Sequence, residues 1–190
     1  MSVPRVAAHM SHISRTLNLG CGVRPLAGAV NLDVSPDVGA DVVHDLNCTP
    51  WPFPDETFDE IHASDVIEHL DDVVQALGEM HRICRHGARV HIAVPHFSCA
   101  NSFTDVTHRH HFGWRSFDPF LESTTPHQLA HYSPVRFRRV SARIFFYHSL
   151  ANKLVHRCAN RWPEAYERRW AWVFPAWFMS VELEAIKRAE

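Results

Sequence analysis

The segment "LNLGCGVRPLAGAVNLD", residues 17–33, decides the fold. It places a short apolar strand before Gly20 and Gly22, followed by a second strand that ends in Asp33. Glycines let a backbone turn pass close to a ligand because no Cβ stands in the way. In open α/β sheets, ligands bind beyond the carboxyl ends of the strands. The segment therefore predicts a ligand site at the edge where both strands end.

Further strand and helix patterns follow along the first half of the chain. The predicted strands cover 16–19, 29–33, 40–46, 58–64 and 88–94. Residues 69–84 carry apolar side chains at helical spacing. Strands separated by crossovers predict an α/β fold with a mostly parallel sheet and helices on its faces. Only seven residues, Val23 to Ala29, join the first two strands. A parallel crossover usually needs a dozen or more, so the first one is predicted to be shortened to a turn.

Composition limits the class of protein. The chain has 190 residues, of which 46% are hydrophobic and 21% charged, as in a soluble globular domain. The net charge of −2 offers no global basic surface for nucleic acid. The five cysteines include no C-x-x-C pair, so we expect reduced thiols and a cytoplasmic location. We also expect neither a signal peptide nor a membrane span.

Polar residues follow the later strands as well. Asp33 at the end of the second strand suits both hydroxyls of a ribose, and Asp45 suits the exocyclic amine of adenine. The Leu46 backbone would then meet the ring edge, and Ser64 ends the fourth strand. Each acid taken alone is more often a solvated loop charge or a helix cap than a ligand-binding residue. The ordered set favours a nucleoside site.

Several segments resemble one known family. They are "LNLGCG", "VNLD", "HDL", "PFPDETFDEIHASDVIEHL" and "EMHRICRHGARVHIAVP", and they span residues 16–95. Together they resemble the class I S-adenosylmethionine-dependent methyltransferases, in particular the small branch with a type-11 methyltransferase domain. The resemblance implies a Rossmann-like sheet, S-adenosylmethionine as the cofactor, and methyl transfer.

The resemblance also implies roles for individual residues. Gly20 and Gly22 would lie beside the methionine part of the cofactor, and Ser64 near its sulfonium end. Asn18 stands where the family often has an acid, so it offers a hydrogen bond but no charge. Glu68 and His69 are typical of the family and are interpreted as helix-start and packing residues. The implied cofactor-binding residues are Asn18, Gly20, Cys21, Gly22, Asp33, Asp45, Leu46 and Ser64.

The segment "THRHHF", residues 107–112, follows the strand after which the methyl acceptor is usually bound. A histidine base supported by Asp105 is one interpretation, and the predicted catalytic residues are His108, His111, His96 and Asp105, with His110 as a further candidate. A metal site formed by Asp105, His108 and His110 or His111 is the second, although the spacing matches no specific metal motif. Ordinary structural histidines are the third. No metal ligand is assigned from the sequence.

The rest of the chain completes a single domain, 1–190. Residues 16–95 form the cofactor-binding core, and 96–134 the acceptor-site or lid segment. Residues 135–147 have the pattern of a strand or hairpin, and 148–190 look helical, with breaks at Pro163 and Pro175. The aromatic segment "WPEAYERRWAWVFPAWF" (162–178) is expected to pack on the sheet, cover the cofactor, form a homodimer interface or touch a membrane surface, and packing or dimerisation is favoured.

The expected function is methyl transfer to an oxygen or nitrogen nucleophile of a small molecule or sugar, without a nucleic-acid partner. Two alternatives stay open at this point. One is a metal-dependent enzyme on the same fold that uses the histidines of 108–111. The other is a non-catalytic, cofactor-binding subunit of a larger assembly.

Overall fold

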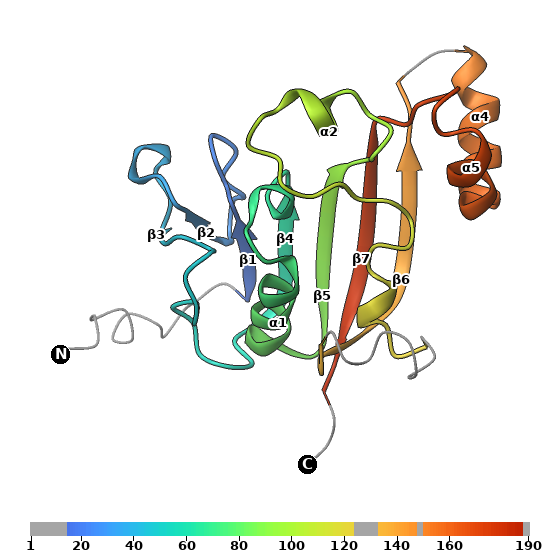
Figure 1. Cartoon of the computed structure of the whole chain (residues 1–190). Helices are drawn as coiled ribbons and strands as arrows, with labels where there is room; N and C mark the ends of the chain where they lie inside the picture. The colour runs from blue at the N-terminus through green and yellow to red at the C-terminus, as the bar shows by residue number, and fades with distance from the viewer. Residues whose placement is uncertain (1–14, 124–132, 148–149, 188–190) are drawn as a thin grey trace.

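A twisted sheet of seven strands forms the centre of the molecule (Figure 1). The structure is a computed structural model that describes residues 15–123, 133–147 and 150–187. The strand order is β3-β2-β1-β4-β5-β7-β6. The strands are β1 (Thr16–Leu19), β2 (Val30–Asp33), β3 (Val42–Val43), β4 (Phe58–Ser64), β5 (Cys84–Pro95), β6 (Arg136–Phe145) and β7 (Phe178–Ile186). The pairings among β1 to β5 are parallel, and β7 is antiparallel to β5 and β6. The predicted mostly parallel, Rossmann-like α/β fold is confirmed.

Helices are few and short. The described helices are α1 (Val73–Ile83), α2 (Asn101–Thr104), α4 (Leu150–Arg161) and α5 (Pro163–Arg169), with 3₁₀ turns η2 (Pro36–Val38), η3 (Ile67–His69) and η4 (Asp118–Phe120). Helix α1 begins at Asp72, whose side chain accepts a hydrogen bond from the Gln75 backbone N–H. It packs Leu77, Met80 and Ile83 into the core. The predicted helix 69–84 is therefore confirmed over Val73–Ile83, while His69 ends the turn η3, residues 70–72 are not helical and Cys84 begins β5.

The first crossover, Val23–Ala29, contains no helix, as predicted. The buried side chain of Asn31 holds it in place. Its Oδ1 accepts a hydrogen bond from the Leu26 backbone N–H at 2.7 Å, and its Nδ2 contacts the Leu26 and Ala29 carbonyls at 3.2 Å each. Nδ2 also lies 3.2 Å from an Asp41 carboxylate oxygen. One amide thus organises a loop that in a longer crossover would be anchored by a packed helix.

The C-terminal segment corrects one prediction. Residues 148–190 were expected to be helical, with breaks at Pro163 and Pro175, but 178–186 form strand β7 between β5 and β6. Met179, Val181, Leu183 and Ala185 are buried, and the residues between them are partly exposed. This two-residue alternation is the pattern of a strand, and the two neighbouring strands satisfy its backbone on both sides. The expected helix is therefore confined to α4 and α5.

Helices α4 and α5 lie beside β6, at the end of the sheet opposite to β1, β2 and β3 (Figure 1). They do not cover the edge where β1 and β2 end. Helices α4 and α5 therefore do not cover the predicted cofactor edge, whereas Trp177 and Phe178, at the end of the aromatic segment, line the pocket described below. Within the described ranges no helix is long and apolar enough to cross a membrane.

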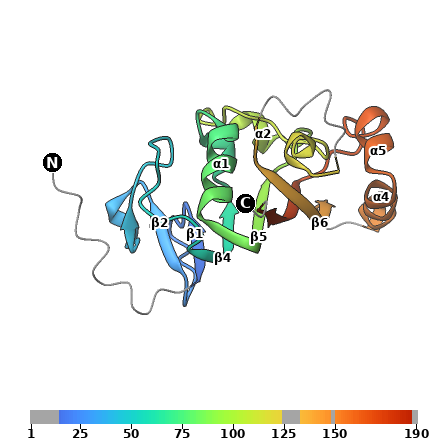
Figure 2. The same cartoon turned by 90° about the horizontal axis from the view of Figure 1, so that it is seen from below.

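Helices α1 and α2 lie on the same side of the sheet (Figure 2). On the opposite face, β4, β5 and β7 present half-exposed polar side chains, among them Glu60, His91 and Glu182. No helix of the described residues covers this face. Parallel sheets are usually covered on both sides, so the short crossovers leave this one unusually open.

Candidate functional site

The glycine turn after β1 and the acid after β2 meet at the carboxyl edge of the sheet. The Gly22 backbone N–H donates to Asp33 Oδ2 at 2.8 Å, and the Ser35 N–H donates to Asp33 Oδ1 at 2.9 Å. Each carboxylate oxygen has a second lone pair, so Asp33 keeps acceptor capacity for two ligand hydroxyls. A Cβ added at Gly22 would meet no atom within 4 Å, so the backbone is accessible there. This arrangement fits the ribose of the expected cofactor.

Gly20 has a different constraint. Its φ is +58°, and a Cβ at this position would lie 2.4 Å from Val66 Cγ2. A side chain at residue 20 is therefore excluded by both backbone conformation and packing. The turn after β1 is held tightly against the segment after β4, which brings the two strand ends together.

Asn18 and Cys21 lie at the turn, but their described contacts are with protein. Asn18 Nδ2 donates to Asn31 Oδ1 at 3.0 Å and so supports the short crossover. Cys21 is buried, and burial, with added repulsion from Asp33 and Asp41, raises the pKa of its thiol. The thiol is therefore neutral and acts as a small packing group.

The two residues predicted at the adenine lie next to Asp33. The His44 backbone N–H donates to the Asp33 carbonyl at 2.9 Å, which places the following Asp45 near this edge. Asp45 is exposed, and its Oδ1 accepts from the Asn47 N–H at 2.9 Å. Leu46 is buried and its carbonyl accepts from Trp51 Nε1. The fold thus brings Gly22, Asp33 and Asp45 to one edge, and the two acceptor carboxylates fit the hydroxyl and amine donors of an adenosine.

A pocket of about 540 Å³ lies beyond the ends of β4, β5 and β7. Ser64, at the end of β4, is exposed beside Asp65, which lines the pocket. The Arg24 guanidinium of the short crossover contacts Asp65 Oδ2 at 3.2 Å. The pocket therefore adjoins the predicted cofactor edge. Its polar lining includes Asp65, His69, Asn101, Thr104, Asp105 and His108.

The structure brings two of the predicted catalytic residues, Asp105 and His108, into this pocket. His108 Nε2 lies 3.8 Å from Asp105 Oδ2. His96 is fully buried, with its Nδ1 2.8 Å from Ser98 Oγ and its Nε2 3.1 Å from Glu167 Oε1. Both ring nitrogens of His96 are engaged, which is typical of a structural histidine.

His110 and His111 lie away from the pocket lining. His110 Nε2 lies 2.9 Å from the Leu70 carbonyl oxygen, and His111 Nδ1 lies 2.8 Å from Ser102 Oγ. His111 also stacks on Phe103. The metal set considered as an alternative, which joined Asp105 and His108 to one of these two residues, is therefore not assembled in this structure.

Two residues that the sequence analysis assigned to packing lie at this site. Glu68 is 1% exposed, and neither of its carboxylate oxygens has a hydrogen-bond partner within the part of the chain that the structure describes. Burial, with added repulsion from Asp65 and Asp105, raises its pKa to about 7. His69 lines the pocket next to it. The sequence signal was the pair Glu68-His69, which follows the fourth strand after three residues. The sequence could not show that Glu68 would be buried.

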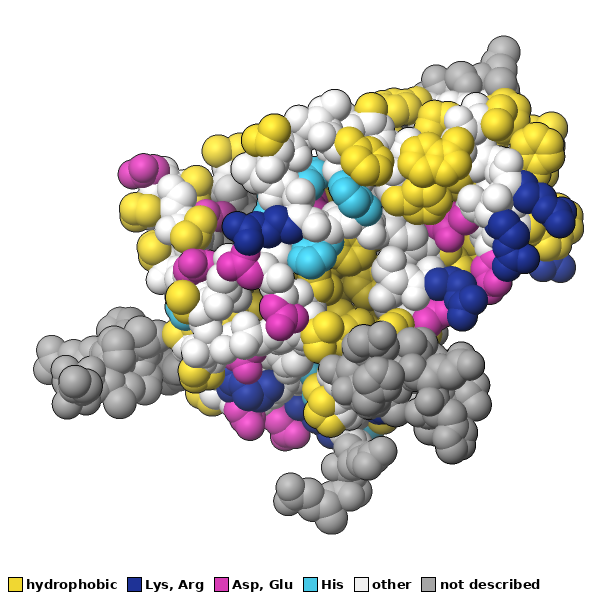
Figure 3. Space-filling model, viewed as in Figure 1, with side chains coloured by type: hydrophobic (Ala, Val, Ile, Leu, Met, Phe, Trp, Pro, Cys, Tyr) yellow, Lys and Arg dark blue, Asp and Glu magenta, His cyan; other side chains and the backbone are white. Residues whose placement is uncertain are grey.

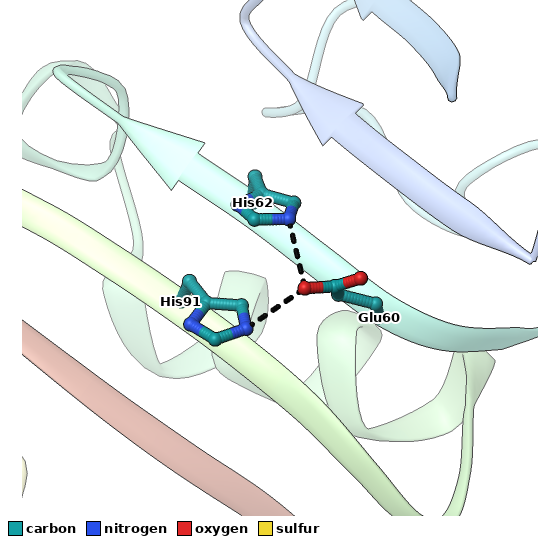
Figure 4. A group of neighbouring side chains, drawn as sticks. All are labelled: Glu60, His62 and His91. Atoms are coloured by element: carbon teal, nitrogen blue, oxygen red, sulfur yellow. Dashed lines mark ion pairs between the residues drawn. The ribbon is translucent and has the colours of Figure 1, made fainter. Parts of the chain in front are cut away.

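A second His–Glu cluster lies on the open face of the sheet (Figure 4). His62 Nε2 and His91 Nε2 lie 3.1 and 3.0 Å from Glu60 Oε1. The two imidazole rings stack with centroids 4.7 Å apart because residues 62 and 91 are paired in register. No sequence pattern indicates this cluster, because it forms only through the pairing of β4 with β5.

Comparisons with known proteins agree with the fold. Residues 17–92 match the family model of the methyltransferase domain. The fold is similar to a SAM-dependent methyltransferase from Archaeoglobus fulgidus, with a TM-score of 0.61, 16% identity, and 90% of this chain and 86% of that chain covered. It is also similar to an S-adenosylmethionine-dependent methyltransferase from Mesorhizobium loti, with a TM-score of 0.55, 16% identity and 90% of each chain covered. None of the curated proteins matches the chain.

The family match covers the strands and turns that form the predicted cofactor edge, from β1 to β5. The similar structures extend the same fold over nearly all of the chain. Residues 17–92 therefore match a methyltransferase domain, and nearly all of the chain shares the fold of S-adenosylmethionine-dependent methyltransferases.

Proposed function

We propose that the enzyme methylates an oxygen or nitrogen nucleophile of a small molecule or sugar bound in the 540 Å³ pocket. The observation that carries this proposal is the place of the pocket, next to the glycine turn and Asp65 at the carboxyl edge. Its volume suits a small acceptor, since ligand pockets typically measure about 300–1,000 Å³. The net charge of the chain is −2, which gives no support for nucleic acid as the acceptor.

The cofactor residues have separate tasks in this proposal. Asp33 holds the ribose and Asp45 the adenine amine, while Gly20 and Gly22 admit the methionine part. Bound S-adenosylmethionine supplies an electrophilic methyl group and departs as S-adenosylhomocysteine. The chain itself orients the acceptor and excludes water from it.

His108 is the proposed proton acceptor. Its Nδ1 lies 3.4 Å from the Ser102 carbonyl oxygen, which can only accept, so Nδ1 carries the proton. Nε2 then holds a lone pair beside the pocket and can take the proton that the acceptor loses. Asp105 lies 3.8 Å from Nε2, close enough to stabilise the imidazolium that forms.

We further propose that residues 1–190 act as one domain, in the cytoplasm, in small-molecule biosynthesis. Hydrophobic side chains gather at the α4–α5 end of the molecule (Figure 3). They include Trp162, Trp170, Trp172, Val173 and Phe174, all more than two-fifths exposed. Aromatic side chains exposed together in this way favour a homodimer interface over a surface that stays in contact with water. Contact of this surface with a membrane is the alternative, and light scattering with and without lipid vesicles separates the two.

The proposed function is tested in two steps. Calorimetry with S-adenosylhomocysteine measures cofactor binding, and a set of phenols, catechols, amines and sugars is then tested for acceptor-dependent formation of S-adenosylhomocysteine. The variant His108→Ala should lower kcat without changing cofactor affinity, and His91→Gln, on the open face, should change neither. Cofactor binding without transfer to any acceptor in the set would contradict the proposed acceptor class.

A further inference from the structure

We propose that Glu68, His69 and His108 bind a divalent transition-metal ion at the wall of the acceptor pocket. The ion would bind oxygen atoms of the methyl acceptor directly. This inference rests on the proposed function, because it places the ion in the proposed acceptor pocket. One nitrogen of each imidazole and one Glu68 oxygen lie within 4.8 Å of one another.

The Glu68 carboxyl group points to a missing ligand. It is 1% exposed, and both of its oxygens lack a hydrogen-bond partner among the described residues. A buried polar group without a partner is destabilising and is rare in native proteins. Asp65 and Asp105 add further negative charge nearby. A bound cation would supply the partner that the protein does not.

The two imidazoles are held in the tautomer that a metal ion requires. Thr107 Oγ1 donates to Asp105 Oδ1 at 2.6 Å, so its oxygen must accept from His69 Nδ1, which lies 2.9 Å away. His108 Nδ1 faces the Ser102 carbonyl, so it also carries its proton. Both Nε2 atoms therefore keep a free lone pair. Metal-binding histidines commonly donate their other N–H to a carbonyl or carboxylate in this way.

The spacing of the ligand atoms is close to that of a metal site. Ligand atoms about 2.1 Å from an octahedral ion lie roughly 3.0 Å apart, so the present separations of up to 4.8 Å must shrink by less than 2 Å. His69 and His108 already meet edge to face, with ring centroids 4.6 Å apart. Small side-chain rotations are sufficient to close the site.

The cluster of Glu60, His62 and His91 on the open face differs from the Glu68 cluster because its carboxylate already has hydrogen-bond partners. There, Glu60 Oε1 already has both imidazole Nε2 atoms at hydrogen-bond distance (Figure 4). Those nitrogens must carry protons to donate, so their lone pairs are not available. The Glu60 cluster is complete without an ion, whereas the Glu68 cluster is not. It therefore provides the matched control for the test.

The ligand set indicates the class of ion and of acceptor. Two imidazoles and one carboxylate favour Mn²⁺, Fe²⁺, Co²⁺ or Zn²⁺ over Ca²⁺, and leave open coordination positions. An acceptor with two adjacent oxygens, such as a catechol or a vicinal diol, can occupy two of them. With the ion bound, His108 Nε2 is a ligand and cannot act as the base. The ion would then lower the pKa of the acceptor's hydroxyl group, and Asp105, which lines the pocket, would take the proton in place of His108. We therefore infer an oxygen acceptor of this kind.

Metal binding is tested by calorimetry on chelator-treated enzyme with Mn²⁺, Co²⁺ and Zn²⁺. Glu68→Gln and His108→Gln should each weaken one binding event by about 100-fold or more, and His91→Gln should leave it unchanged. Binding lost only in His91→Gln, binding unchanged in all three variants, or no binding at all would overturn the inference. S-adenosylhomocysteine affinity, measured on every variant, confirms that the site is folded and tests the proposed function separately.

The acceptor class is tested by equilibrium binding of catechol and phenol. With Mn²⁺ present, catechol should bind about tenfold or more tightly than phenol, because a chelate forms through both oxygens. This difference should disappear in His108→Gln and in metal-free enzyme. Equal affinities in the wild-type enzyme with Mn²⁺ would overturn the inferred acceptor class.

Discussion

The protonation state of Glu68 should change the free energy of unfolding of the metal-free protein. Burial raises the pKa of its carboxyl group from 4.5 to about 7, because the charged form is separated from water and faces Asp65 and Asp105. In the unfolded chain the same group has its ordinary pKa. Between these two values the folded state binds more protons than the unfolded state. The free energy of unfolding must therefore fall as the pH rises through this window.

The size of the effect follows from the two pKa values. The difference between about 7 and 4.5, at about 1.4 kcal/mol for each pH unit, corresponds to roughly 3 kcal/mol. The variant Glu68→Gln carries no titrating group. Its stability relative to the wild type should be constant below pH 4.5 and should increase by about 3 kcal/mol up to pH 8, where the wild-type carboxylate is charged.

The assay is urea unfolding at pH values from 4 to 9 in the presence of a chelator. The quantity of interest is the difference in unfolding free energy between Glu68→Gln and the wild type at each pH. Glu60→Gln serves as the control, since Glu60 is half-exposed and hydrogen-bonded to His62 and His91. Parallel pH profiles for the wild type and Glu68→Gln would refute the argument, because a buried carboxyl with a raised pKa cannot leave stability independent of pH.

Three further predictions concern the cofactor edge. Asp33→Ala should weaken S-adenosylhomocysteine binding by about 10- to 100-fold in calorimetry, through loss of a charge-assisted acceptor for the ribose; unchanged affinity would mean that the site is misplaced. Gly20→Ala should lower the free energy of unfolding by about 2 kcal/mol or more, because residue 20 has a positive φ and the new Cβ would collide with Val66. The control is Gly78→Ala in α1, where the new Cβ would meet no atom within 4 Å; it should raise the free energy of unfolding by up to about 1 kcal/mol. Asn31→Ala should cost about 2 kcal/mol or more in urea unfolding, because the crossover loses its anchor and buried backbone groups lose their partner; a near-neutral effect would show that the loop is held by other contacts.

The cofactor-binding half could be predicted because its signals are local. The glycine turn at residues 20–22, the acid at residue 33 and the alternating strand at 58–64 depend on backbone conformation and short-range periodicity. The seven-residue link to the second strand predicted the missing crossover helix from length alone. The same local signals led to a wrong prediction at 178–186, where β7 forms because two strands stand ready to pair with it. Tertiary pairing outweighs local propensity in such a segment.

The sequence by itself determined the class of fold and the match of residues 17–92 to a methyltransferase domain, and it predicted the segment that would face the acceptor. Only the tertiary structure decided which histidines act together. His108 meets His69 and Glu68 across nearly forty residues, while the adjacent His110 and His111 turn to backbone and serine partners. Neighbours in the chain point in different directions, so spacing cannot select among them. Whether a carboxyl such as that of Glu68 is solvated or buried without a partner depends on what packs over it, and that is a property of the folded chain alone.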